Sequence, residues 1–396
     1  MRVAGFTAYI IRVPLRRPFR HASATRRSSD NLLVQCRLQD GTVGWGEGVP
    51  RSYVTGDTAE DSLRLLAEQP LQERFDHDCS DWADVVAMLD RFHSFKVPDD
   101  MRGARGNPLR AAIEISVLDA FGQLFRKPVG DVGSVITDAE SIRRSPQRVR
   151  YSTTIDAEHP KRLWKSALKM RLYGFKHCKV KIGCSADDDV QRLQTIRRWI
   201  GPRVDLRVDV NEGWNASDFQ RRAEPLLAHR ISCIEQPLPH DQLGELSALR
   251  SQVKVPIMLD ESLTSWQDAT ESIALGAGDV WNLRLSKCGG FIACLRLAAR
   301  AQQHGLGYQL GCHPGETGIL SAAGRHWAQS VGNVQYCEGS YDRHVLAANL
   351  IHEEITFGYG GWAPPLTAPG LGVTVDLKRL RAMIVKQQTH SMQEAA

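Results

Sequence analysis

Polar residues that could do chemistry recur along the chain at intervals of 25 to 28 residues, each at the end of a short apolar run. They are Lys181, Asp209, Glu235, Asp260, Lys287 and His313. Three carboxylates brought together would repel one another unless a cation lies between them. Their oxygens suit a hard divalent ion, Mg²⁺ or alternatively Mn²⁺, with positions left open for substrate oxygens. No histidine or cysteine accompanies them at the spacing of zinc ligands.

The segment "KHCKVKIG", residues 176–183, places two lysines in what reads as a buried strand. Side chains alternate along a strand, so Lys179 and Lys181 share one face. An ammonium group beside another cation or an apolar wall has a lowered pKa and can act as a base near neutral pH. We expect Lys181 to remove a proton α to a carboxylate and Lys179 to lower its pKa. Lys287, from the far side, would return the proton or stabilise charge.

Two further residues flank the carboxylates. Asn211 follows Asp209 by two positions and should point the same way, where it would orient the metal ligands. Glu261 follows Asp260 directly, so the alternation of a strand predicts that Glu261 points away from the metal and pairs with a lysine.

Strand-like and helix-like segments alternate from about residue 148. The predicted strands are 148–155, 177–183, 205–211, 231–237, 255–262, 280–287, 307–312 and 333–339, and predicted helices include 158–173, 185–200, 289–304 and 316–330. This alternation predicts an α/β fold of βαβ units, and eight such strands predict a closed (β/α)-barrel. The carboxyl ends of barrel strands open onto one face, so the six recurring residues should meet there.

Composition narrows the class of protein. The chain has 396 residues, of which 42% are hydrophobic and 24% charged, and its net charge is +5. No apolar run is long enough to span a bilayer, and no basic, aromatic-interleaved face indicates nucleic acid. The nine cysteines form no CxxC pair, which favours reduced thiols and the cytoplasm. We expect a small carboxylate substrate, no nucleic-acid or membrane partner, and a homo-oligomer.

Several segments carry a family resemblance. In order, "KVKIG", "RVDVNEGW", "IEQPL", "MLDESL" and "LSKCGG" resemble the enolase superfamily, and within it the muconate-lactonizing subgroup. Flanking segments such as "DGTVGWGEGVPRSYVTGDT" and "APGLGVTVD" resemble the capping domain of that family. The resemblance implies a barrel of the modified TIM type, (β/α)7β, with an α+β capping domain. It places the capping domain at 1–130, the barrel at 145–345, and a segment returning to the cap at 355–396.

The same resemblance implies an enzyme that uses Mg²⁺ to abstract a proton α to a carboxylate and to stabilise the enolate. It assigns the metal ligands to Asp209, Glu235 and Asp260, the base to Lys181 tuned by Lys179, and the opposing lysine to Lys287. Glu316, in "HPGETGI", matches a position near the substrate. We expect His313 to contact the substrate or to support the ligands.

Two loops that close over the site in this family match residues 16–30 and 50–57. Their glycines and charged residues suit mobile lids. Arg20, Arg51 and Tyr53 in these segments are therefore candidates for substrate contact.

Several reactions share this chemistry. A muconate-cycloisomerase-like isomerase or lyase is the first expectation, with o-succinylbenzoate synthase or N-acylamino acid racemase activity as alternatives. The segment "CEGSYDRH" lacks the Asp-x-Asp that dipeptide epimerases of the family use for the substrate ammonium group. More distant alternatives are a Schiff-base lysine aldolase, which would not need three strand-end carboxylates, and a non-catalytic barrel.

Overall fold

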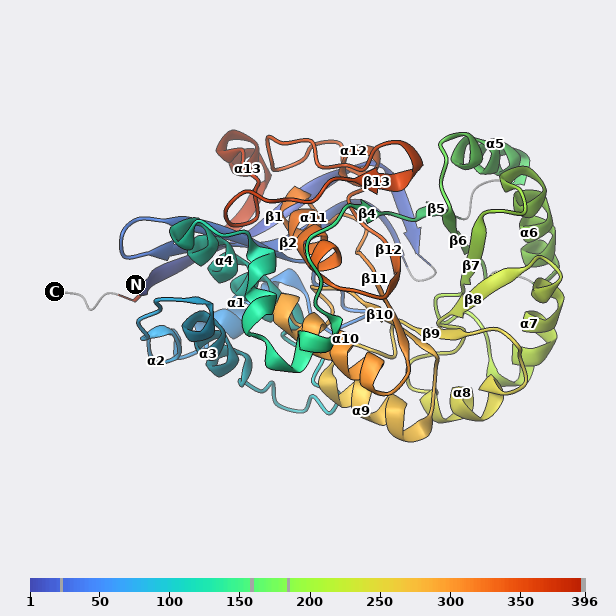
Figure 1. The fold of residues 1–396 in the computed structure, drawn as a ribbon, viewed down its shortest axis with the longest axis horizontal. Coiled ribbons are helices and arrows are strands. Elements are labelled where there is room, and N and C mark those ends of the chain that lie inside the picture. The colour runs from blue at the N-terminus through green and yellow to red at the C-terminus, as the bar shows by residue number, and fades with distance from the viewer. Residues whose placement is uncertain (22–23, 157–159, 184–185, 393–396) are drawn as a thin grey trace.

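The computed structural model describes residues 1–21, 24–156, 160–183 and 186–392. An eight-stranded parallel sheet curls into a barrel, and a four-stranded antiparallel sheet with its helices packs beside the barrel (Figure 1). The predicted (β/α)-barrel with an α+β cap is therefore confirmed.

One longer α-helix follows each barrel strand except the last, after which comes only the four-residue α12 (Asp342–Val345). The strands are β5 (Thr153–Ile155), β6 (His177–Lys181), β7 (Asp205–Asp209), β8 (Ile231–Glu235), β9 (Ile257–Leu259), β10 (Val280–Leu283), β11 (Gly307–Leu310) and β12 (Val334–Cys337). The helices are α5 (Pro160–Leu172), α6 (Ala186–Ile200), α7 (Phe219–Leu227), α8 (Leu243–Arg250), α9 (Trp266–Leu275), α10 (Phe291–Gln303) and α11 (Gly318–Ser330). Spatial order follows chain order from β5 to β12, which is the (β/α)7β pattern. The amide of Ser152 donates to the carbonyl of Cys337 at 2.7 Å and joins the first strand to the last.

The first predicted strand, 148–155, is wrong in its extent. It splits into β4 (Val149–Arg150), which pairs antiparallel with β13 (Trp362–Ala363), and the three-residue β5 of the barrel. The division follows from a contact that is remote in sequence, because the amide of Tyr151 donates to the carbonyl of Gly361 at 2.7 Å. The remaining predicted strands are present, and each is shorter than expected.

The antiparallel sheet has the order β14-β1-β2-β3. Its strands are β1 (Val3–His21), β2 (Ala24–Leu38), β3 (Val43–Gly48) and β14 (Ile384–Ser391). Around it lie α1 (Ala59–Ala67), α2 (Leu71–Phe75), α3 (Trp82–His93) and α4 (Asn107–Phe125). The 3₁₀ turns that follow α4 pack on barrel helices, η1 (Val129–Val135) on α11 and η2 (Thr137–Ile142) on α10. Residues 16–21 and 24–30, expected as a loop, extend the β1–β2 hairpin.

Glycines let β3 lie directly on α4. A Cβ atom added at Gly46 would stand 2.0 Å from the carbonyl oxygen of Ala112, and one at Gly48 would stand 2.1 Å from that of Pro108. No side chain fits such a gap, which explains the alternating glycines of "GWGEG".

The C-terminal part of the chain crosses back to the antiparallel sheet. It contains α12 (Asp342–Val345), η4 (Tyr359–Gly361), α13 (Leu377–Met383) and β14, which pairs with β1. The domain boundaries at 1–130, 145–345 and 355–396 stay predictions, as does the homo-oligomer. None of the described helices is long and apolar enough to cross a membrane. The eight cysteines within the described residues are all free thiols.

Glu47 on β3 joins the antiparallel sheet to the barrel. Its carboxylate accepts hydrogen bonds from the amides of Thr317 at 3.0 Å and Leu320 at 3.1 Å, and from the side chain of Asn31 at 2.6 Å. Burial raises the pKa of Glu47 to about 7, against the hydrogen bonds that lower it. The first amides of a helix have no partner within the helix, so Glu47 supplies the cap of α11.

Glu114 on α4 does the same for α10. Its carboxylate accepts hydrogen bonds from the amides of Phe291 at 2.5 Å and Ile292 at 3.0 Å, and it lies 3.3 Å from the ring of His93. Burial raises the pKa of Glu114 to about 8 and lowers the pKa of His93 to about 3. Two helices of the barrel thus begin on carboxylates from the neighbouring sheet and helix.

We predict that Glu47→Ala destabilises the protein by about 2–4 kcal/mol, since it leaves the buried amides of Thr317 and Leu320 without this acceptor and removes one of the two acceptors of Asn31. Urea unfolding followed by circular dichroism measures the loss. Glu224→Ala, which removes an exposed glutamate from α7, should change stability by less than about 0.5 kcal/mol. Equal losses in the two variants would contradict the capping role.

Glu114→Gln should change how stability depends on pH. Folded Glu114 keeps a proton up to about pH 8, while the unfolded chain releases it near the ordinary value of 4.5, so native stability should fall as pH rises between these values. His93 acts with the opposite sign below its ordinary pKa of 6.5. The fall should therefore be clearest between about pH 6.5 and 8, where it amounts to about 1–2 kcal/mol.

The measurement for Glu114 is the urea midpoint of the native protein and of Glu114→Gln at both ends of that pH window. The glutamine variant cannot lose the proton, so its midpoint should change less with pH than that of the native protein. Parallel pH dependences in the two proteins would contradict a protonated Glu114.

Candidate active site

A cavity of about 530 Å³ opens at the carboxyl ends of the barrel strands. Its inner wall includes Lys179, Lys181 and Asp209, and its outer wall includes Arg17 and Tyr53 from the antiparallel-sheet part of the chain. The predicted site residues are thus largely brought to one place, at the end of the barrel where such sites are built.

Lys179 lies among three carboxylates. Its Nζ stands 2.9 Å from Glu338, 3.2 Å from Glu235 and 3.3 Å from Asp209. Burial alone would lower the pKa of Lys179, but Glu235, Glu338 and Asp209 together raise it well above its ordinary value. Lys179 is therefore held as a buried ammonium ion.

Lys181 lies two residues further along β6 and is less buried. Its Nζ donates to Oδ1 of Asn211 at 2.8 Å and stands 3.9 Å from Oδ2 of Asp209. The amide of Asn211 in turn donates to Asp209 at 3.2 Å. Asn211 therefore connects the predicted base to a predicted metal ligand, which fits the orienting role expected of it.

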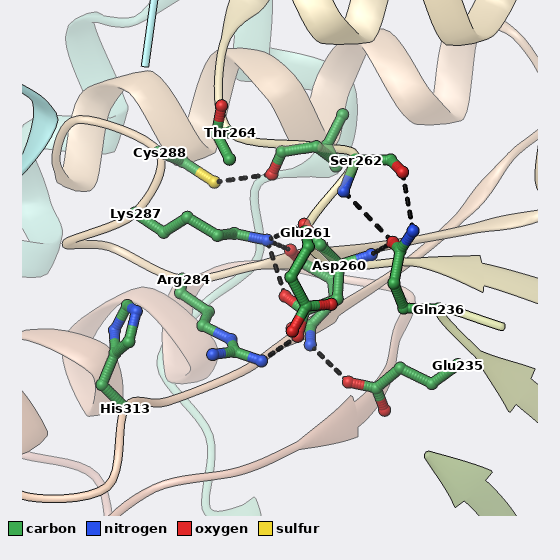
Figure 2. Close-up of polar contacts among 12 residues, drawn as sticks. Glu235, Gln236, Asp260, Glu261, Ser262, Thr264, Arg284, Lys287, Cys288 and His313 are labelled. Atoms are coloured by element: carbon green, nitrogen blue, oxygen red, sulfur yellow. Dashed lines mark hydrogen bonds and ion pairs between the residues drawn. The ribbon is translucent and has the colours of Figure 1, made fainter. Parts of the chain in front are cut away.

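Lys287 points toward Asp260 (Figure 2). Its Nζ donates to Oδ1 of Asp260 at 2.8 Å, to the carbonyl of Asp260 at 2.7 Å and to the carbonyl of Asn282 at 2.8 Å. Lys287 is buried, and unlike Lys181 it does not line the cavity. These three acceptors hold its ammonium group back from the space that a substrate would fill.

The three predicted metal ligands are buried at the ends of consecutive parts of the barrel. Asp209 and Glu235 end β7 and β8, and Asp260 follows β9. Among the described side chains no three histidine, cysteine, aspartate or glutamate groups stand gathered as a ready metal site. Lys179 lies between Asp209 and Glu235, and the guanidinium group of Arg284 contacts Asp260.

The chemistry of these ligands nevertheless fits a divalent cation. All of the donors are carboxylate oxygens, the type that Mg²⁺ prefers. Oε2 of Glu235 is buried without a hydrogen-bond partner, while Oε1 of the same residue accepts from Asn282 at 2.8 Å. Burial raises the pKa of Glu235 to about 7, against the ammonium group of Lys179 that lowers it. An added cation would satisfy the unpartnered oxygen of Glu235.

Glu261 differs from its prediction. It lines the cavity, and its Oε1 accepts a hydrogen bond from the side chain of Asn211 at 3.4 Å. The alternation of side chains applies only within a strand, and β9 ends at Leu259, so Glu261 lies in a turn. Both Asp260 and Glu261 can therefore face the same space, as Figure 2 shows.

His313 and Glu316 lie together in the loop after β11. The amide of His313 donates to Oε1 of Glu316 at 2.5 Å, and its Nδ1 stands 3.6 Å from the same oxygen. Burial, followed by the charge of Arg284, lowers the pKa of His313 well below its ordinary value, and burial raises that of Glu316 to about 8. His313 and Glu316 both line the cavity. Figure 2 shows His313 next to Arg284.

The three candidates for substrate contact differ in their placement. Tyr53 lines the cavity, and the guanidinium group of Arg26 lies 5.2 Å from its ring centre. Arg51 is buried beneath the cavity loop, where it donates to Ser29 at 2.5 Å and to the carbonyl of Pro314 at 3.2 Å. Arg51 therefore supports the loop that carries His313 and Glu316. The side chain of Arg20 lies outside the described part of the structure.

Sequence reasoning missed two charged residues of the site. Glu338 directly follows β12, and it contacts Lys179 and Arg207. The strand-end pattern that selected Asp209 would also have selected Glu338. Arg284 lies two positions beyond Asn282, in the predicted strand 280–287. A cationic residue within a predicted apolar strand was also the signal that identified Lys179.

Comparisons with known proteins agree with this geometry. Residues 162–379 match the family described as Enolase C-terminal domain-like. The N-succinyl-L-Arg/Lys racemase of Bacillus cereus is 29% identical over 332 residues, which cover 83% of this chain and 85% of the racemase. The hydrophobic dipeptide epimerase of Enterococcus faecalis is 29% identical over 330 residues, which cover 82% of this chain and 86% of the epimerase. Muconate cycloisomerase 1-2 of Acinetobacter lwoffii is 26% identical over 390 residues, which cover 96% of this chain and 94% of the cycloisomerase.

Solved structures have the same fold. The crystal structure of the Bacillus cereus racemase has a TM-score of 0.85 and 26% identity, with 98% of this chain and 100% of that chain covered. The Enterococcus faecalis dipeptide epimerase, crystallised with Mg and the dipeptide L-Leu-L-Tyr, has a TM-score of 0.81 and 24% identity, covering 94% and 100%.

We predict that Asp209→Asn weakens Mg²⁺ binding at least about 10-fold, because loss of a direct ligand should cost no less than loss of a group that only orients one. The fold should persist, since Lys179 keeps its contacts with Glu235 and Glu338. Calorimetric titration with MgCl₂ measures affinity, and circular dichroism monitors the fold. Asp138→Asn, an exposed aspartate in η2, is the control. Unchanged affinity in Asp209→Asn would contradict the metal assignment.

Proposed function

The chain belongs to the enolase superfamily, and on that premise we propose that it is a Mg²⁺-dependent racemase acting on the α-carbon of an N-acylated amino acid. The observation that carries this proposal is the position of two lysines on opposite sides of the site. Lys181 ends β6 and Lys287 follows β10, and these strands are opposite each other in a ring of eight. A base and an acid on opposite faces of one carbon would invert its configuration.

Metal binding would fall to Asp209, Glu235 and Asp260. A Mg²⁺ ion bound by these residues would supply positive charge that makes the α-proton of a carboxylate substrate more acidic. The other steps belong to the side chains of this protein. Lys179, fixed as a cation by its three carboxylates, places a positive charge on the same strand as Lys181, two residues away.

Proton transfer on the other face of the α-carbon would be carried out by Lys287. Its ammonium group carries the proton that would be delivered to the other face of the α-carbon. To reach the substrate it has to release at least one of its bonds to Asp260 or Asn282. In the reverse direction Lys287 would remove the proton and Lys181 would return it, as expected for an enzyme that acts on both enantiomers.

An N-acyl amino acid without a free ammonium group suits this site better than a dipeptide, which carries one on its first residue. Asp342, the aspartate of "CEGSYDRH", is buried and already accepts hydrogen bonds from Ser321 at 2.7 Å and Asn349 at 3.0 Å. The dipeptide-type reaction is therefore less favoured than racemization, and the 29% identity to an N-succinyl amino acid racemase supports the same choice.

A cycloisomerase is the second candidate. The alignment with a muconate cycloisomerase covers 96% of this chain, which supports the expectation drawn from the sequence. That reaction needs one proton-transferring lysine, so the two candidates predict different consequences for loss of Lys287.

The test is hydrogen–deuterium exchange at the α-carbon of N-acetyl-L- and N-acetyl-D-methionine in D₂O, followed by NMR. Lys181→Ala should slow exchange from one enantiomer at least about 10²-fold, the lower range for general base catalysis. Lys287→Ala should do the same for the other enantiomer. Each variant should keep exchange of the enantiomer whose proton it does not remove.

Lys96→Ala, which removes an exposed lysine after α3, is the control and should exchange both enantiomers at the native rate. Loss of exchange from one enantiomer only in Lys181→Ala, with no effect of Lys287→Ala on either, would favour a one-base reaction. Native exchange in Lys181→Ala would reject the assigned base.

A further inference from the structure

Basic side chains gather at the outer part of the active-site cavity. Arg16, Arg17, Lys169 and Arg343 all line it, and all four are exposed. We call these four residues the basic rim. The inner part of the same cavity holds the buried groups Lys179, Asp209 and Glu338. The rim therefore lies where a substrate would extend toward solvent.

The basic rim is assembled from three separate parts of the chain. Arg16 and Arg17 belong to β1, Lys169 to α5 and Arg343 to α12. Backbone contacts fix β1 beside the chain that follows α12, since Leu15 forms a β-bridge with Leu346 and the amide of Ala347 donates to the carbonyl of Pro14 at 2.9 Å.

Charges of the basic rim act together on the ring of His344. Burial lowers its pKa most, Arg343 and Lys169 lower it further, Glu354 opposes them, and Arg16 makes a smaller contribution that also lowers it. Residues remote in sequence thus raise the positive potential at one side of the cavity. A potential of this kind attracts an anion.

Aromatic side chains form the wall next to the rim. Tyr173 follows Lys169 by four positions, and its ring centre lies 5.2 Å from that of Phe175. Phe357 packs against Phe175 at 5.5 Å and against Tyr341 at 5.5 Å. All four rings line the cavity, so the part of a substrate that they contact is apolar.

The acidic side chains inside the cavity have partners of their own. Glu338 and Asp209, deep in the cavity, are engaged by Lys179, and Asp342 accepts hydrogen bonds from Ser321. Glu353 and Glu354 line a neighbouring groove, which Arg16 and Arg343 also line, whereas Arg17 and Lys169 do not line that groove. Asp156 is the acidic residue that shares the exposed wall with the rim.

We infer that the basic rim binds a second anionic group of the substrate. The substrate is then an N-acyl amino acid with two negative charges, one on the carboxylate beside the α-carbon and one at the far end of an apolar stretch. This inference rests on the proposed function, because the proposed chemistry fixes where the first carboxylate binds.

The test compares two pairs of probes that differ in one distal charge. N-adipoyl-L-alanine and its terminal carboxamide place the charge on the acyl group, and N-acetyl-L-glutamate and N-acetyl-L-glutamine place it on the side chain. The measurements are kcat/KM for α-proton exchange in D₂O and the dissociation constant by calorimetry. We expect the charged member of at least one pair to be favoured about 10-fold, several exposed charge pairs acting together.

Two variants and a salt titration assign the preference to the rim. In the double variant Arg16→Gln/Arg343→Gln the ratio between charged and neutral probes should fall toward about 1. Arg37→Gln, an exposed arginine of β2 outside the cavity, should keep the native ratio. The native ratio should also fall as NaCl is raised, because salt screens exposed charges.

The outcomes separate this inference from the proposed function. Equal binding and exchange of charged and neutral probes in both pairs would overturn the anionic substrate, even if exchange is fast. A charge preference that survives in the double variant would overturn the role of the rim. Tight, charge-selective binding without any α-proton exchange would support the rim while rejecting the racemase.

Discussion

Charge balance around Lys179 is the constraint on which the site depends. Its ammonium group stands within 3.3 Å of Asp209, Glu235 and Glu338, three carboxylates that could not be buried together without it. Loss of one partner from such a cluster leaves an uncompensated buried charge, at a cost of about 3–5 kcal/mol. Arg284 and Lys287 serve Asp260 in the same way. The barrel mouth is thus a set of opposite charges that hold one another in fixed orientations.

The recurrence of polar residues at strand ends made much of this site predictable. Parallel strands alternating with helices bring their carboxyl ends together, so the sequence alone places Lys181, Asp209 and Glu235 on one face. The prediction was wrong beyond the end of a strand, where the alternation of side chains no longer applies. Glu261 lies in the turn that follows β9, and strand alternation says nothing about side chains in a turn.

Contacts between remote segments could not be predicted from local pattern. The strand expected at 148–155 divides because residues near Gly361 pair with its first half, and Arg51 is drawn under the loop at Pro314 instead of reaching the cavity. The capping of α11 by Glu47 joins residues 270 positions apart. Such contacts are decided by the packing of complete elements, and a single sequence carries no periodic signal for them.

The glycine seam between β3 and α4 has a consequence for how this protein can change over generations. Backbone contact at Gly46 and Gly48 leaves no room for new side chains, so substitutions there carry a heavy penalty and the seam resists drift. Arg16 and Arg17 on the β1–β2 hairpin are under no such restriction, because their side chains are exposed. New substrate preferences can therefore arise by exchange of a few exposed residues, while the catalytic chemistry is inherited intact.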